Sequence, residues 1–173
     1  MNCLVYKINN SLYAVDAGTV VGVENSLALN SFPGQPAFIA GLADIRGKMT
    51  PVVSVHRYFS LPVRRDGVAL VIGNGASNIA FLTDGVEAIR EIDFDDTSEA
   101  PLIIRAFAGC VKNMTLVDGK PVIFMDLLSI IPEDQMEQLD TFMKMVEKPK
   151  EEEKTEADDG EEPSEGSKDG EDQ

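Results

Sequence analysis

Apolar residues recur at about every second position along much of this chain, in short runs separated by small polar turns. Such alternation over about four to eight residues is typical of β-strands with one buried face. Asn9-Asn10, Arg46-Gly47-Lys48 and Gly73-Asn74-Gly75 suit tight hairpin turns between neighbouring runs. The pattern predicts strands over residues 2–8, 11–16, 20–24, 42–46, 49–55, 67–73, 77–83, 86–91, 107–114 and 120–126.

Short strands without intervening long helices predict antiparallel barrels of about five strands, filled by Val, Ile, Leu and Phe. Pro36 at a first helical position predicts a single turn through Ala40, and residues 56–61 predict another. The clearest helix starts at Pro132, because apolar residues follow it at three- and four-residue intervals. We expect this seam to pack back onto the first barrel; it consists of Met136, Leu139, Met143 and Val146.

The chain also shows an internal repeat with a period of about seventy residues. Residues 4–16 and 69–84 each read as a strand, a small polar turn, a second strand and a closing aspartate. Further equivalences pair Gly41 with Gly109 and Pro51 with Pro121. Two copies predict two similar β subdomains packed together, not a solenoid. The alternative is coincidence among short strands rich in Val and Ile.

Composition changes sharply near Val146. Residues 147–173 contain 13 acidic and 4 basic residues, and Ala157 is the single apolar one. Such a segment buries too little apolar surface to offset its ordering entropy, so we expect a disordered acidic tail over 147–173 and one domain over 1–146. The whole chain has a net charge of −15, which makes nucleic acid and anionic lipid poor partners.

The remaining features predict a cytoplasmic protein without catalytic chemistry. No signal peptide and no membrane-spanning run is present, so we expect no direct insertion into a membrane. Cys3 and Cys110 lie in apolar segments and are interpreted as buried structural thiols, in preference to a disulfide or a reactive site. The single histidine, His56, is interpreted as structural or solvated. Asp84 and Asp126 end strands and are expected to cap turns, so the sequence predicts no enzyme and no cofactor or metal.

Residues 37–53 carry a family resemblance. Their sequence, Ala-Phe-Ile-Ala-Gly-Leu-Ala-Asp-Ile-Arg-Gly-Lys-Met-Thr-Pro-Val-Val, resembles the signature P-x-F-I-x-G-x-x-x-[LI]-R-G-x-[VIM]-x-P-[VI]-[VI] of CheW-type chemotaxis coupling proteins. Residues 4–15 resemble the opening hairpin of that family, and residues 79–86 resemble its "v-G-l-x-V-D-x-V" strand. The resemblance covers residues 2 to about 146, so the chain is identified as a divergent member with an added acidic tail.

The resemblance implies a fold dominated by β-structure, with two intertwined SH3-like five-stranded barrels, short helices and a C-terminal helix. The expected subdomains are 16–62 with the C-terminal helix, and 67–128, with the N-terminal strands shared. The implied function is that of a non-catalytic adaptor, recruited to receptor arrays at the membrane. The resemblance implies three partners. The regulatory domain of a CheA-type histidine kinase contacts the barrel ends, and the cytoplasmic signalling tip of a chemoreceptor lies in the groove between the barrels. Other CheW-like copies are the third.

The resemblance also implies roles for particular residues. Arg46 is exposed on the turn that Gly47 permits and contacts a partner; without the signature it would be interpreted as a solvated hairpin arginine. The partner-binding set is Arg46, Ile45, Lys48 and Val86, and the set that shapes the backbone is Gly41, Gly47, Pro51 and Asp84.

Three departures leave the pathway open. Gly22 stands where the family often has a glutamate, and Ser54 and His56 replace an aspartate and an arginine. These changes remove charge from the first barrel. A CheW-like module in a pathway other than chemotaxis, or a barrel that binds a small ligand, therefore remain alternative functions.

Overall fold

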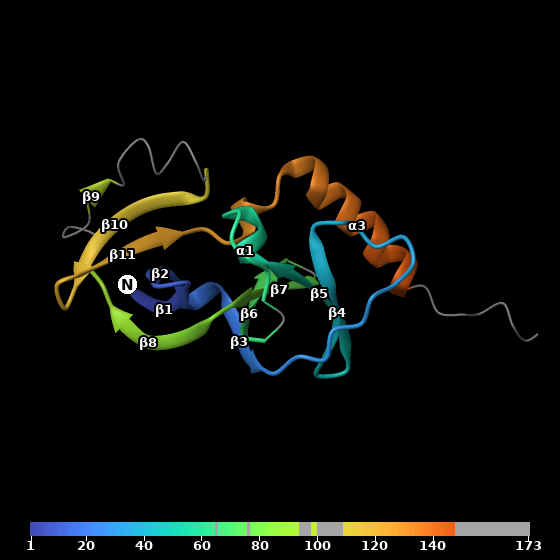
Figure 1. Ribbon diagram of the computed structural model, residues 1–173, viewed down its shortest axis with the longest axis horizontal. Coiled ribbons are helices and arrows are strands. Elements are labelled where there is room, and N and C mark those ends of the chain that lie inside the picture. Colours follow the sequence, from blue (N-terminus) through green and yellow to red (C-terminus); the bar gives the residue numbers. More distant parts are fainter. Residues whose placement is uncertain (65, 76, 94–97, 100–108, 148–173) are drawn as a thin grey trace, which may run out of the picture.

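A computed structural model of the chain describes residues 1–64, 66–75, 77–93, 98–99 and 109–147. Strands make up most of it, with a few short helices and one long helix at one end (Figure 1). The strands are β1 (Asn2–Ile8), β2 (Ser11–Asp16), β3 (Val20–Asn25), β4 (Ile39–Ile45), β5 (Lys48–Ser54), β6 (Val68–Asn74), β7 (Ser77–Thr83), β8 (Gly85–Glu91), β9 (Ser98–Glu99), β10 (Val111–Val117) and β11 (Lys120–Met125). The helices are η1 (Ala17–Thr19), α1 (Val55–Tyr58), η3 (Leu128–Ile130) and α3 (Glu133–Glu147).

Most predicted elements are present, and two differ. The strand expected at 107–114 is β10, which spans Val111–Val117, and residues 107 and 108 lie outside the described part of the chain. The helical turn expected from Pro36 to Ala40 is a turn closed by a hydrogen bond from the Ile39 N–H to the Pro36 carbonyl, and β4 then begins at Ile39. Strand pairing of β4 with β5 starts at Ile39 itself, so Ile39 and Ala40 belong to a strand and cannot form part of a helix.

The strands form two sheets that serve as the walls of two barrels. The first barrel has the order β3-β6-β7-β5-β4, and the second has the order β8-β1-β2-β11-β10 with the short β9 at its edge. Each sheet contains one parallel pair, β5 with β7 and β2 with β11, among antiparallel neighbours. The fold is therefore the expected pair of five-stranded β subdomains.

The two barrels exchange hairpins. The β6–β7 hairpin belongs to the sheet of β3, β4 and β5, whereas the N-terminal hairpin belongs to the sheet formed by β8, β10 and β11. This corrects the expected boundary, because residues 67–83 complete the first barrel and not the second. A boundary drawn between the sequence halves fails because each barrel takes strands from both halves.

The predicted internal repeat is confirmed for the hairpins, but some of the residues that it equates do not occupy equivalent positions. Ile8 pairs with Ser11 in the first hairpin, and Asn74 pairs with Ser77 in the second, so the two hairpins match at an offset of 66 residues. The β4–β5 and β10–β11 turns match at an offset of 72. Gly109 lies in a turn before β10, and Pro121 matches Met49, so Gly41 with Gly109 and Pro51 with Pro121 are not structural equivalents.

A continuous apolar core joins the barrels and α3. It contains buried side chains from both sheets, including Tyr6 and Phe81, together with Leu139 and Phe142 of α3. Met136, Met143 and Val146 pack against the same core, which confirms the predicted seam. Tyr58 of α1 donates a hydrogen bond to Gln135 at 2.7 Å, so the helix lies on the first barrel as expected.

Both cysteines are free and buried, as the sequence predicts. Burial raises the pKa of the Cys3 and Cys110 thiols, which leaves little of the nucleophilic thiolate at neutral pH.

Candidate functional site

The β4–β5 hairpin presents Arg46 at its tip. Arg46 and Gly47 both have positive φ, 54° and 82°, which is the backbone of the type I′ turn that matches the twist of paired strands. The Asp44 carboxylate accepts a hydrogen bond of 2.8 Å from the Gly47 N–H and stabilises this turn. The Arg46 side chain is 72% exposed. The expected position of Arg46 on a turn between two strands is therefore confirmed.

Within the described part of the chain, Arg46 makes one ion pair, which holds it against the edge strand β3. Its Nη2 lies 3.4 Å from Oε1 of Glu24, and a Cβ added at Gly22 would lie 3.4 Å from the same nitrogen. The guanidinium therefore crosses over Gly22, the position of the missing glutamate, and reaches a glutamate two residues further along the strand. An exposed pair of this kind contributes at most about 1 kcal/mol, so a partner's carboxylate can replace it at little cost.

The second barrel carries the same arrangement with the charges exchanged. Arg90 of β8 lies 3.2 Å from Asp118, which occupies the turn position equivalent to Arg46 and also has a positive φ, 52°. Glu24 pairs across its sheet with Ala69, and Arg90 pairs with Cys3, which matches Ala69 at the hairpin offset of 66. The two ion pairs therefore occupy equivalent positions with opposite polarity.

The other residues of the predicted partner-binding set are not all gathered around Arg46. Ile45 is buried in the apolar cluster of the first barrel, so it can support the turn but not touch a partner. Lys48 is exposed at the other end of the same turn. Val86 lies on β8 of the second barrel and is 36% exposed, close to Ile89, which is 65% exposed. Sequence reasoning does not single out Ile89, because residues three apart lie on opposite faces of a regular strand. Only the bulge in the pairing of β8 with β1 brings Ile89 to the face of Val86.

The backbone-shaping role of Gly41 has a direct cause. A Cβ at this position would lie 2.8 Å from the backbone oxygen of Asn30, which is closer than side chains tolerate. Asn30 is held in place by two backbone hydrogen bonds of 2.8 Å with Leu42. The 26–38 loop can therefore approach β4 only because residue 41 has no side chain.

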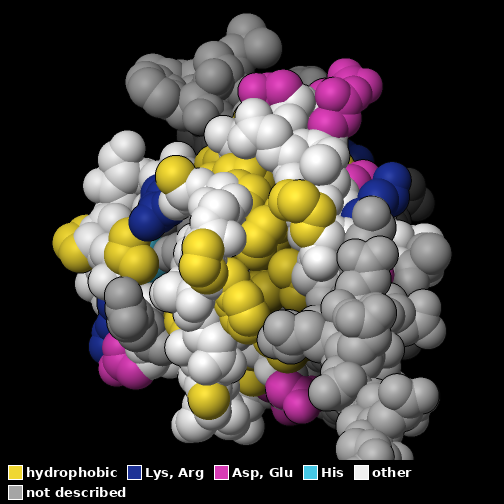
Figure 2. Space-filling view, turned by 90° about the vertical axis from the view of Figure 1, so that its right-hand side faces the viewer, with side chains coloured by type: hydrophobic (Ala, Val, Ile, Leu, Met, Phe, Trp, Pro, Cys, Tyr) yellow, Lys and Arg dark blue, Asp and Glu magenta, His cyan; other side chains and the backbone are white. Residues whose placement is uncertain are grey.

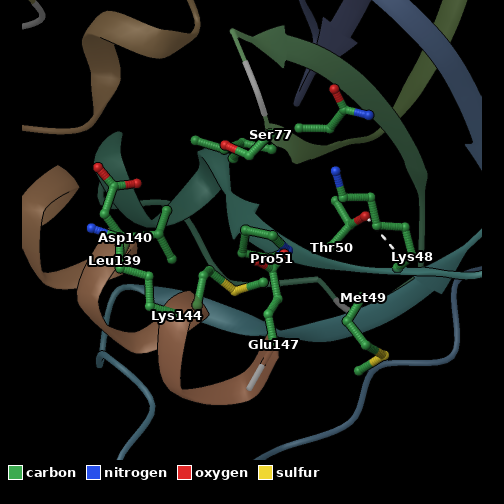
Figure 3. Close-up of a pocket in the computed structure, with 12 residues that line it drawn as sticks. Lys48, Met49, Thr50, Pro51, Ser77, Leu139, Asp140, Lys144 and Glu147 are labelled. Atoms are coloured by element: carbon green, nitrogen blue, oxygen red, sulfur yellow. Dashed lines mark hydrogen bonds between the residues drawn. The ribbon is translucent and has the colours of Figure 1, made fainter. Parts of the chain in front are cut away.

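An apolar hollow lies between α3 and the first barrel. It has a volume of about 380 Å³, with Pro51, Ile79, Leu139 and Met143 among its apolar lining residues. Figure 3 shows Leu139, Asp140 and Lys144 of α3 facing Thr50 and Pro51 of β5 across this space. Figure 2 views the end of the molecule at which α3 and β4 lie, and it shows apolar side chains gathered in the hollowed centre of that face.

Asp84 lies at the junction of the two barrels, between the last residue of β7 and the first residue of β8. Its Oδ1 is 2.9 Å from Nε2 of His56, and its Oδ2 accepts a hydrogen bond from the Asn9 N–H. His56 is buried, only 2% exposed, which excludes the solvated one of its two interpretations and leaves the structural one. The sequence does not reveal this pair, because the two residues are 28 positions apart and share no motif.

Residues 2–135 match the sequence pattern of the CheW-like domain family. The chain belongs to this family. The chemotaxis protein CheW of Thermotoga maritima is 24% identical over 135 residues, which cover 75% of this chain and 87% of that protein. CheW of Klebsiella aerogenes is 18% identical over 145 residues, which cover 82% and 87%. The crystal structure of the scaffolding protein TtCheW from Thermoanaerobacter tengcongensis has the same fold, with a TM-score of 0.68 and 21% identity over 78% of this chain and 94% of that one.

Family membership gives the chain its function: it is a non-catalytic coupling adaptor of chemotaxis-type signalling. None of these relatives favours a small-ligand protein. Among the described residues, no helix is long and apolar enough to cross a bilayer, and no cluster of three His, Cys, Asp or Glu side chains could hold a metal ion.

Proposed function

We propose that this CheW-like chain links the signalling tip of a chemoreceptor to the regulatory domain of a CheA-type histidine kinase. It does so by presenting separate surfaces to the two partners within receptor arrays. The receptor contact is centred on Arg46, and the kinase contact is the apolar hollow between α3 and β5.

The observation that carries this proposal is the exposed Arg46 on a turn whose backbone is already fixed. A planar guanidinium recognises a carboxylate through two parallel hydrogen bonds, and the Asp44–Gly47 hydrogen bond holds the turn without help from a partner. The Glu24 ion pair keeps the arginine extended over β3, so little side-chain entropy is lost on binding. Lys48 adds positive charge beside it. We assign Val86 of β8 to the same contact, which then spans both barrels.

The hollow supports the kinase contact by its chemistry. Its apolar residues lie on rigid elements, and charged side chains of Lys48, Asp140, Lys144 and Glu147 surround them. An apolar centre with a polar rim is the usual anatomy of a protein interface. Because the hollow opens between the helix and β5, a partner there need not cover the tip of the β4–β5 turn.

The test measures binding of a chemoreceptor cytoplasmic fragment and, separately, of the kinase regulatory domain. Arg46→Ala and Arg46→Glu should weaken receptor binding, the glutamate more, because the reversed charge adds repulsion to the lost hydrogen bonds. Kinase-domain binding should change less. Melting temperatures should stay nearly constant, because surface substitutions usually change stability by less than about 0.5 kcal/mol.

Arg90 provides the matched control. It is also an exposed arginine with one acidic partner, but it lies on the second barrel. Arg90→Glu should leave receptor binding near the wild-type level. If Arg46→Glu binds the receptor normally, the receptor contact is not at Arg46. If Arg90→Glu weakens binding equally, the effect of charge reversal is not specific to the β4–β5 turn. If Arg46→Glu unfolds, Arg46 is a structural residue instead.

A further inference from the structure

The chain passes from the first barrel to the second through a single residue. β7 ends at Thr83, β8 begins at Gly85, and Asp84 alone connects them. By contrast, the passage from β2 to β3 takes the three residues of η1. The angle between the barrels therefore depends strongly on how Asp84 is held.

The two carboxylate oxygens of Asp84 are bonded to different barrels. Oδ1 lies 2.9 Å from Nε2 of His56, which is in α1, directly after β5 of the first barrel. Oδ2 accepts from the N–H of Asn9, in the turn between β1 and β2 of the second barrel. The Asp84 N–H also donates to the carbonyl of Lys7, at 3.0 Å. One side chain thus connects both barrels at the point where the chain crosses.

His56 depends on this carboxylate. Its side chain is 3% exposed, and its Nδ1 has no hydrogen-bond partner among the described residues. The bond to Asp84 is therefore the polar contact that orients the ring, and losing it would leave the imidazole buried without a partner. Arg64 approaches the same oxygen at 3.7 Å but is 56% exposed, so it contributes less.

The crossing from β2 to β3 has no comparable contact among the described residues. Asp16 bonds to the Gly18 N–H at 2.8 Å, within its own turn. At the hairpin offset of 66, the residue that matches Asp84 is Gly18, which has no side chain. The contact is therefore a feature of one crossing and not of the repeated fold.

We infer that Asp84, held by His56 and Asn9, is a positioning residue that fixes the angle between the two barrels. The shared apolar core keeps the barrels together, but apolar packing is not directional. Hydrogen bonds to a nearly buried carboxylate are directional, so they select one arrangement. With respect to function the inference rests on the proposed coupling role, because a partner that contacts both barrels needs their surfaces at a fixed angle.

The test is the distance between spin labels on the two barrels of the full chain. Met145→Cys on α3 and Leu116→Cys on β10 give exposed labelling sites, 61% and 69% exposed, whereas the native cysteines are buried. Pulsed electron paramagnetic resonance then gives the distance distribution. We compare the labelled parent with the same protein carrying Asp84→Asn or Asp16→Asn.

Asp84→Asn keeps the size of the side chain and one acceptor oxygen for His56. It places an NH₂ group against the Asn9 N–H, so two donors face each other. We expect a broader or shifted distance distribution for this variant and an unchanged one for Asp16→Asn. A distribution that matches the parent in a folded Asp84→Asn variant would overturn the inference.

If Asp84→Asn does not fold, His56→Gln decides. Glutamine fills less of the buried site and holds the carboxylate less firmly, so the distribution should again broaden; an unchanged one overturns the inference. The distances are measured without any partner, so they are independent of the proposed coupling role. In the binding assay, Asp84→Asn should weaken the receptor fragment about tenfold and leave the kinase domain, which contacts one barrel, unchanged. If the distances change and receptor binding does not, Asp84 fixes the angle between the barrels but receptor binding does not depend on both of them.

Discussion

Leu139→Ala tests how α3 is attached to the first barrel. Leu139 is 1% exposed and belongs to the core that α3 shares with both sheets. The substitution removes three buried carbons, each worth about 0.8 kcal/mol. The cavity that is left adds to this loss, since the strands beneath are held by their own ladders and relax little. The expected loss is about 3 kcal/mol.

Urea unfolding measures this loss directly. The midpoint should fall while the m-value stays constant, because the variant still unfolds as one unit. For a domain of this size the same loss lowers the melting temperature by about 6 to 12 °C. Met145→Ala is the matched control, because Met145 is in the same helix but 61% exposed, and it should change stability by less than about 0.5 kcal/mol. A loss below about 1 kcal/mol for Leu139→Ala would mean that α3 is not anchored through its seam.

Two further changes test the fold at other points. Gly41→Ala should destabilise the protein by about 1 to 3 kcal/mol, because the new Cβ meets the fixed Asn30 oxygen; Gly85→Ala, where a Cβ meets nothing, is the control in the same melting experiment. Burial alone would raise the pKa of Asp126, but hydrogen bonds from Ser129 and Lys112 lower it below its ordinary value. A carboxylate whose pKa is lower in the folded state stabilises the fold at pH values above the unfolded pKa of about 3.9. This stabilisation is lost as pH falls. At pH 6 the wild type should be more stable than Asp126→Asn by less than about 1 kcal/mol, because the carboxylate is partly exposed. This difference in unfolding free energy should shrink below about pH 4. A difference that stays constant with pH would contradict the lowered pKa of Asp126.

Strands, turns and the long helix could be predicted from this sequence, because each depends on the pattern of residues close together in the chain. Alternation located the strands, paired turn residues located the hairpins, and the spacing of Leu139 and Met143 located the long helix with its packing face. The family signature identified the tip of the β4–β5 turn. The disordered tail remains a prediction, because residues 148–173 lie outside the described part of the chain.

The missed features depend on contacts between distant residues. The exchange of hairpins cannot be seen in alternation, since β6 has the same pattern whichever barrel it joins. No sequence motif or regular spacing relates His56 to Asp84, so their contact cannot be predicted from the sequence. The family resemblance places Ile45 in the partner-binding set, but side chains alternate along a strand, and its place on β4 turns it inward.

The duplicated architecture explains why the charged centre of the proposed receptor site lies on one barrel only. β3 and β8 match residue for residue through the same bulge, since Val20 and Val86 pair with Ile72 and Tyr6, and both strands then skip one position. Backbone geometry therefore cannot distinguish the two edges for a partner. Side chains can, because the first edge offers an arginine at the turn and a glutamate on the strand, while the second offers an aspartate and an arginine. Like charges facing each other disfavour binding even where shape fits, so a carboxylate-bearing partner that accepts the first edge is repelled at the turn of the second. Two similar barrels thus present distinct surfaces, which an adaptor that holds different partners at once requires.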